Sequence, residues 1–200
     1  VAAQGSDLDE PTGLLFSRPG LAARPKGGGI FEVSIPQDAA PGIVDVWLVG
    51  RFGVSNPRGF EIASVPATIV APTNTSPASA FALAPDAIAQ ARTTANAIDH
   101  YTVPLKKGQR VVARVLAREL DSRLEPVLAV FGPDGREIER VRRPFLDILA
   151  AQDGAYGIRV HDGLFRGGDD YGYRLSANTG PQVDFAVPNV LRATWAVARV

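Results

Sequence analysis

One stretch of the chain concentrates the residues best suited to binding a metal, Asp162-Gly-Leu-Phe-Arg-Gly-Gly-Asp-Asp170. Calcium takes several oxygens from carboxylates and carbonyls, and Gly167-Gly168 would let backbone carbonyls turn inward. The candidate ligands are Asp162, Asp169 and Asp170, with Asp121 and Asp99 as more distant candidates. The stretch therefore suggests a calcium site. The alternative is a solvated loop in which the Asp side chains cap turns.

Histidine and cysteine supply little other chemistry. The chain has two histidines, His100 and His161, and no cysteine. A transition-metal site needs clustered His or Cys, so this composition argues against one. Ser122, His161 and a neighbouring carboxylate could be drawn as a hydrolytic triad, but nothing resembles a nucleophile elbow. We therefore expect no catalysis and no resident cofactor other than calcium.

Aromatic and basic residues also form local clusters. Tyr171 and Tyr173 are spaced to share one face of a strand, with Phe165 nearby. Such a group could stack on sugars, although alternating aromatics in a strand are typical of a core. The basic run from Arg136 to Arg143 is interleaved with glutamates, which favours a solvated hairpin over an anion-binding patch.

Bulk composition limits the classes of partner. The 200 residues are 46% hydrophobic and 21% charged, with 21 basic and 21 acidic side chains. A neutral chain has no overall field to attract nucleic acid or an anionic membrane, so we expect neither as a partner. No apolar run is long enough to predict membrane insertion. Because residue 1 is Val and methionine is absent, we expect Val1 to be internal to a longer chain whose export signal lies upstream.

The pattern in the first third predicts strands. Phe31, Val33 and Ile35 alternate with polar residues, and the β-branched run 43–49 is typical of a central strand. We expect a first module at residues 1–65. Four prolines among Ala, Thr and Ser predict a semi-extended linker at residues 66–86, which could fold against the next module.

The second module is expected at residues 87–178. Small apolar residues occupy every second position from Val111 to Ala117, apolar and polar residues alternate after Tyr156, and turn signals recur about every ten residues. Only residues 88–98 could be helical, and a strand pair suits them equally well. The fold class predicted is all-β: an immunoglobulin-like β-sandwich followed by a jelly-roll-like β-sandwich. Residues 179–200 are expected to begin a further module or to return as a strand.

Two family resemblances support this division. The stretch Phe31-Glu-Val-Ser-Ile-Pro to Ile43-Val-Asp-Val, with Gly53-Val-Ser-Asn-Pro and Phe60-Glu-Ile after it, resembles the C-terminal half of IPT/TIG immunoglobulin-like domains. Residues 71–177 resemble the bacterial pre-peptidase C-terminal domain, a β-sandwich. The segments that carry this resemblance are Asp99-His-Tyr-Thr-Val, Lys107-Gly-Gln-Arg-Val, Leu120-Asp-Ser-Arg-Leu-Glu-Pro-Val-Leu, Phe131-Gly-Pro-Asp-Gly, Gly154-Ala-Tyr-Gly-Ile-Arg-Val and Tyr171-Gly-Tyr-Arg-Leu.

These resemblances imply a function class. They imply a non-catalytic accessory or interaction module of a larger exported protein of planctomycete type, acting as a spacer or as a binder of protein or polysaccharide. The alternative is the appendage of a secreted peptidase or other hydrolase. Some members of the second family bind calcium through carboxylates and an Asn in an acidic linker. Asn74 matches that Asn, but the acidic residue is missing from Ala71-Pro-Thr-Asn-Thr75.

Overall fold

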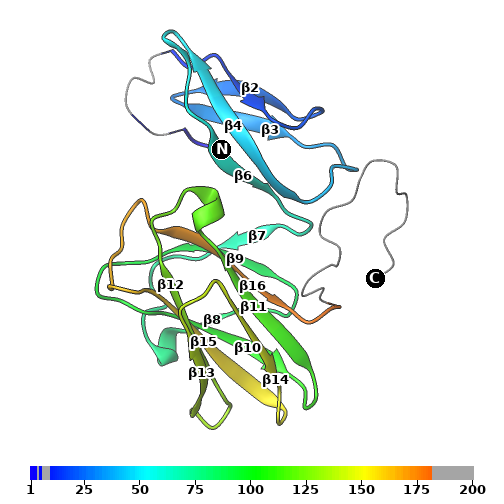
Figure 1. Cartoon of the computed structure of the whole chain (residues 1–200), viewed down its shortest axis with the longest axis vertical. Coiled ribbons are helices and arrows are strands. Elements are labelled where there is room, and N and C mark those ends of the chain that lie inside the picture. Colours follow the sequence, from blue (N-terminus) through cyan, green and yellow to red (C-terminus); the bar gives the residue numbers. More distant parts are fainter. Residues whose placement is uncertain (4, 6–9, 182–200) are drawn as a thin grey trace, which may run out of the picture.

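Among the described residues the regular elements are β-strands, apart from two short 3₁₀ turns, which confirms the all-β prediction (Figure 1). The computed structural model describes residues 1–3, 5 and 10–181. The prediction for residues 179–200 therefore falls mostly outside the described residues. No helix in these ranges is long and apolar enough to span a membrane.

The second module is a sandwich of two five-stranded sheets. In the first, called the β15 sheet, the strand order is β13 (Glu137–Val141), β12 (Pro126–Phe131), β15 (Gly154–Asp162), β10 (Asp99–Leu105) and β8 (Phe81–Ala82). In the second, called the β11 sheet, it is β14 (Phe145–Leu149), β11 (Arg110–Leu116), β16 (Gly172–Asn178), β9 (Ile88–Arg92) and β7 (Ala67–Ile69).

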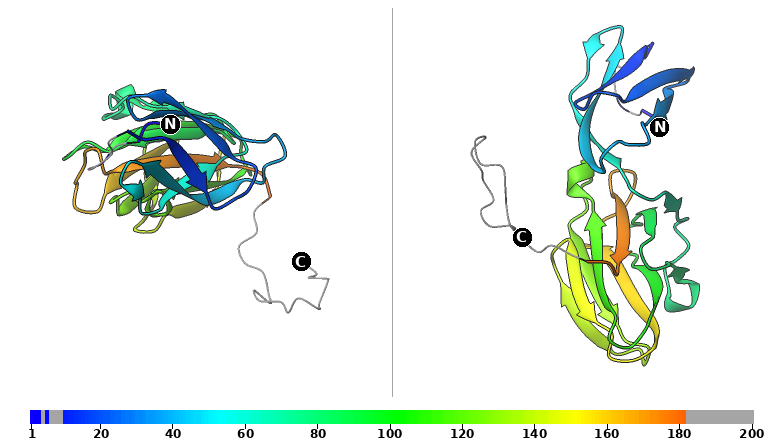
Figure 2. Two further views of the ribbon diagram at one scale, coloured as in Figure 1. Left: turned by 90° about the horizontal axis from the view of Figure 1, so that it is seen from above. Right: turned by 90° about the vertical axis from the view of Figure 1, so that its right-hand side faces the viewer.

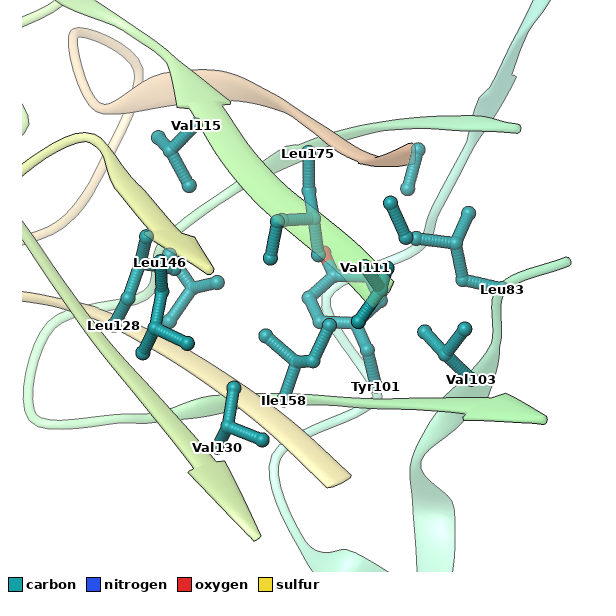
Figure 3. Packing of buried hydrophobic residues seen from close by; sticks show 14 of the residues in the cluster. Leu83, Tyr101, Val103, Val111, Val115, Leu128, Val130, Leu146, Ile158 and Leu175 are labelled. Atoms are coloured by element: carbon teal, nitrogen blue, oxygen red, sulfur yellow. The ribbon is translucent and has the colours of Figure 1, made fainter. Parts of the chain in front are cut away.

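The core lies between these two sheets. Side chains from β10, β12 and β15 meet side chains from β11, β14 and β16, as Figure 3 shows for Tyr101, Ile158 and Leu175. The period-two pattern that predicted β11 and β15 is visible in their alternating burial. Residues 88–92 belong to the segment 88–98, for which the sequence allowed a helix or a strand pair, and they pair with β16 in antiparallel register from Gly172↔Arg92 to Ser176↔Ile88. They are a strand because that pairing buries Ala89 completely.

Residues 66–86 do more than link two modules. They contain β7, the 3₁₀ turn η1 (Pro77–Ser79) and β8. The strand β7 pairs parallel with β9, and β8 pairs parallel with β10, so the segment supplies one edge strand to each sheet. Proline is tolerated in this role because an edge strand needs hydrogen bonds on one side alone. The semi-extended linker of the sequence interpretation is therefore part of the sandwich.

The first module has fewer strands than the second. Its sheet joins β1 (Gly13–Phe16), β4 (Gly42–Gly50), β5 (Gly53–Val54) and β6 (Arg58–Ile62), and a separate ribbon joins β2 (Ala22–Gly27) to β3 (Ile30–Ser34). Among its described residues the buried hydrophobic side chains are Phe31, Val44 and Ile62. The division of the chain at residue 65 stays a prediction.

The two modules touch through β6 and the 3₁₀ turn η2 (Arg118–Leu120), which follows β11 (Figures 1 and 2). The Gly59 amide donates to Asp121 Oδ2 at 2.7 Å. Arg174 Nη1 on β16 lies 2.5 Å from Glu61 Oε2, and both side chains are largely buried. The first module thus packs against one end of the sandwich, the end at which η2 lies.

Candidate functional site

The loop 162–170 is organised by one buried carboxylate. Asp162 ends β15 and has no exposed surface. Its Oδ1 accepts hydrogen bonds from the Leu164 amide at 2.9 Å, the Arg166 amide at 3.1 Å and Arg166 Nε at 2.8 Å. Its Oδ2 accepts from the Glu125 amide at 3.0 Å and Arg166 Nη2 at 3.1 Å. Burial alone would raise the pKa of Asp162, but these hydrogen bonds hold it well below its usual range.

Backbone contacts fasten the same loop to the segment that follows β9. The Gly168 amide donates to the Thr93 carbonyl at 2.9 Å, and the Asn96 amide donates to the Phe165 carbonyl at 2.8 Å. Gly167 approaches this segment so closely that a Cβ would lie 2.3 Å from the Ala95 nitrogen. The loop is therefore held at both ends and in its middle.

The tip of this fastened loop presents apolar side chains to solvent. Leu164 is 74% exposed and Phe165 is 41% exposed. Phe165 has a φ of 55°, in the left-handed region that a bulky residue rarely adopts. Its ring stacks on the buried His161 at 4.4 Å between centroids and 8° between planes. Strained backbone is often found at binding sites. Here the hydrogen-bonded loop fixes the position of two exposed apolar residues.

Leu164 borders a groove at the η2 end of the sandwich, which we call the Leu164 groove. Its volume is about 580 Å³, within the range of ligand pockets. The lining residues are Val115, Ala117, Arg118, Glu119, Leu124, Glu125, Pro126, Val127, Arg142, Arg143, Pro144, Gly163, Leu164 and Arg166. Buried aliphatic side chains from both sheets form the floor, and charged side chains form the rim.

The acidic residues singled out by sequence do not converge. Asp162 is committed to five hydrogen bonds, Asp169 pairs with Arg92, and the Asp170 carboxylate lies 3.6 Å from Arg123 Nη1. Across the described ranges no three acidic or histidine side chains are grouped as a metal ion would need. Calcium binding by this loop stays a prediction, to be decided by the melting temperature with calcium and with a chelator. The geometry does not favour it, since arginines already neutralise all three carboxylates.

The other two acidic candidates also have defined positions. Asp121 directly follows η2 and contacts the first module, as described above. Asp99 begins β10, with 1% of its surface exposed, and accepts a hydrogen bond from the Tyr173 hydroxyl at 2.6 Å. Its Oδ1 has no hydrogen-bond partner among the described residues. Burial raises the pKa of this carboxyl to about 6, although the Tyr173 bond acts in the opposite direction.

The aromatic residues separate into different roles. Tyr173 is buried, and its hydroxyl lies 2.6 Å from the hydroxyl of Tyr101, so it belongs to the core and not to a sugar platform. Tyr171 is half-buried beneath the Arg166 guanidinium at 5.7 Å. The three aromatic residues considered for sugar stacking therefore do not form one surface. Phe165 is the exposed one of the three, and its ring stacks on His161.

Ser122 and His161 each form hydrogen bonds with other residues. The Ser122 hydroxyl donates to the Asp170 carbonyl at 3.2 Å and accepts from the Leu124 amide. Nδ1 of His161 bonds the Asp162 carbonyl at 2.8 Å, and the ring is buried. No hydrogen bond joins the two residues within the described ranges, so the structure does not assemble the triad considered from sequence.

The chain matches no protein-family model and no curated protein sequence. Solved structures are similar to parts of it. The pre-peptidase C-terminal domain of a collagenase from Bacillus anthracis is 13% identical over 49% of this chain and 93% of that one, with a TM-score of 0.37. PliG, a periplasmic inhibitor of g-type lysozyme from Aeromonas hydrophila, is 17% identical over 56% of this chain and 99% of that one, with a TM-score of 0.39.

A structure of carbohydrate-binding modules from the β-sandwich superfamily is 13% identical over 86% of this chain and 94% of that one, with a TM-score of 0.23. At these identities and TM-scores the likenesses do not bear on function. The IPT/TIG resemblance of residues 31–62 stays a prediction.

Proposed function

We propose that this chain is a non-catalytic binding module of an exported protein, and that it holds a protein or a polysaccharide in the Leu164 groove. The observation that carries the proposal is the loop 162–170, whose buried Asp162 holds Leu164 in an exposed position beside an apolar floor. Exposed apolar side chains held rigidly next to a groove are typical of binding surfaces. Export is supported by the family resemblance of residues 71–177.

Binding needs little conformational ordering at this site. The backbone around Leu164 is fixed by hydrogen bonds from Leu164 and Arg166 to Asp162 and by the contact of Gly168 with Thr93. A preformed surface loses less entropy when a ligand binds than a flexible loop does. The arrangement therefore suits recognition without any chemical step.

The test compares two exposed aliphatic residues. Leu164→Asp places a charge at the groove, and Ile69→Asp makes the same change on β7, at the opposite edge of the β11 sheet from β14. The full chain is tested against a panel of insoluble polysaccharides and a peptide array. We expect one class to bind, Leu164→Asp to weaken that binding about tenfold or more, and Ile69→Asp to leave it unchanged. Equal binding by both variants, or none by the wild type, would refute the proposal.

A further inference from the structure

We propose that the ligand of the Leu164 groove is an extended acidic peptide that inserts an aliphatic side chain between the two sheets and places its carboxylates on the arginine rim. This inference rests on the proposed function and names the class of ligand that the groove selects. Three features of the groove lead to it: its aliphatic floor, its unneutralised arginines and its rigid border.

The floor is aliphatic and not aromatic. Val115 and Ala117 come from β11 and its end, Val127 comes from β12, and Leu124 precedes β12. No Phe, Tyr or Trp lines the groove in the described part of the chain. Sugar rings are held by stacking on flat aromatic faces, so this lining is poorly suited to a glycan. A leucine or valine side chain, in contrast, would pack against branched aliphatic walls.

Two arginines of the rim form no ion pair with any residue that the structure describes. Arg143 Nη2 lies 3.3 Å from Glu139 Oε1, and Arg166 is held by Asp162, so these two are neutralised. Arg118 and Arg142 are exposed and make no ion pair with any described residue. A guanidinium binds a carboxylate through two parallel hydrogen bonds. Two such groups beside an apolar floor match a peptide in which acidic residues flank an aliphatic one.

The acidic side of the rim does not cancel this charge. Glu119 Oε1 lies 3.9 Å from Arg114 Nη2, which leaves Glu125 as the rim carboxylate without an ion pair among the described residues. Two arginines therefore face one glutamate. The net positive rim repels a basic peptide and attracts an acidic one, and added salt would weaken that attraction.

The experiment uses three fluorescent heptapeptides and the whole chain. The first has one leucine between two pairs of glutamates, the second replaces the glutamates by lysines, and the third replaces the leucine by glycine. Binding is measured by fluorescence anisotropy at low and at physiological salt. The test variant is Arg118→Glu with Arg142→Glu. The matched control is Arg51→Glu with Lys107→Glu, two basic residues that lie outside the Leu164 groove and have no ion pair within the described ranges.

We expect the glutamate–leucine peptide alone to bind well, the test variant to weaken it about tenfold or more, and the control to leave it unchanged. The peptide inference is overturned if the glycine or lysine peptide binds equally, or if the control variant weakens binding as much as the test variant. If a polysaccharide binds and Leu164→Asp abolishes that binding, the inference fails but the proposed function stands. If neither class of ligand binds, both fail.

Discussion

At the scale of single residues, two buried carboxylates show how partners decide the behaviour of an acid. Asp162 and Asp99 are almost equally inaccessible, yet their pKa values shift in opposite directions. Asp162 accepts five hydrogen bonds, two of them from a guanidinium, so its charged form is favoured. Asp99 accepts one hydrogen bond from a hydroxyl, and its other oxygen has no partner among the described residues, so desolvation dominates. The first acid organises a loop, and the second is a source of pH-dependent stability.

Asp99 leads to a prediction about pH. The pKa of Asp99 is about 6 in the folded protein, above the ordinary 3.8. The stability that Asp99 contributes is therefore complete below pH 3.8 and is lost as the pH rises through 6. We expect Asp99→Asn to raise the free energy of unfolding at pH 8 by at most about 3 kcal/mol relative to the wild type, and to change it little at pH 4. Urea unfolding at a series of pH values measures this difference.

The control for that series is Asp38→Asn, which changes an exposed acid of the first module. Burial lowers the pKa of His100, which therefore also makes stability depend on pH. His100 is present in both proteins, so its contribution cancels when wild type and variant are compared at each pH. A wild-type-minus-variant difference that is the same at pH 4 and pH 8 would contradict the assignment to Asp99.

At the scale of elements, local pattern predicted the sandwich strands well and predicted the site less well. Alternation identified β11 and β15, and it assigned Tyr173 to a strand whose aromatic side chains face a core. The loop 162–170 was singled out for its acidic residues, but their partners lie far away in the sequence. Arg92, for example, is 77 residues from Asp169. No local pattern reveals such a pairing.

The groove itself was missed for the same reason. It forms between the ends of β11 and β12, which belong to different sheets, so its walls meet through tertiary folding alone. The signal that could have pointed to it is the apolar pair Leu164-Phe165 inside an otherwise polar, glycine-rich loop. An apolar pair in a loop has no role in a sheet and must either be buried or present a surface.

Gly167 provides a prediction about this loop. A Cβ there would lie 2.3 Å from backbone atoms of Thr94 and Ala95, which are not free to move aside as a side chain is. We expect Gly167→Ala to lower the free energy of unfolding by about 1–3 kcal/mol and to displace the loop. Hydrogen exchange at the Leu164 and Arg166 amides would speed up, because their bonds to Asp162 are loosened.

A glycine in the same loop serves as the control. A Cβ on Gly163 would meet the Glu125 carbonyl at 3.6 Å, an ordinary contact, so Gly163→Ala should be close to neutral. If both substitutions had equal effects on stability and exchange, the close packing of Gly167 would not be what holds the loop.

At the scale of the whole molecule, the contact between the modules and the Leu164 groove share one element. The turn η2 packs against β6 of the first module, and its Arg118 lines the groove. Asp121, which follows η2, accepts from the Gly59 amide and lies 3.8 Å from Arg58 Nη1. The first module therefore contacts the turn that carries a groove residue.

This arrangement predicts the effect of one methyl group. A Cβ on Gly59 would lie 2.1 Å from the Glu119 carbonyl, so Gly59→Ala must push η2 and β6 apart. We expect the contact between the modules to weaken by about 1–3 kcal/mol, which would split thermal unfolding into two transitions and broaden the small-angle scattering envelope. Because η2 carries Arg118, affinity for the acidic peptide should fall as well.

Gly13→Ala, with open space around its Cβ, is the matched control. A Gly59→Ala protein that still unfolds in one transition and binds the peptide as the wild type does would show that the packing at Gly59 neither couples the modules nor positions Arg118.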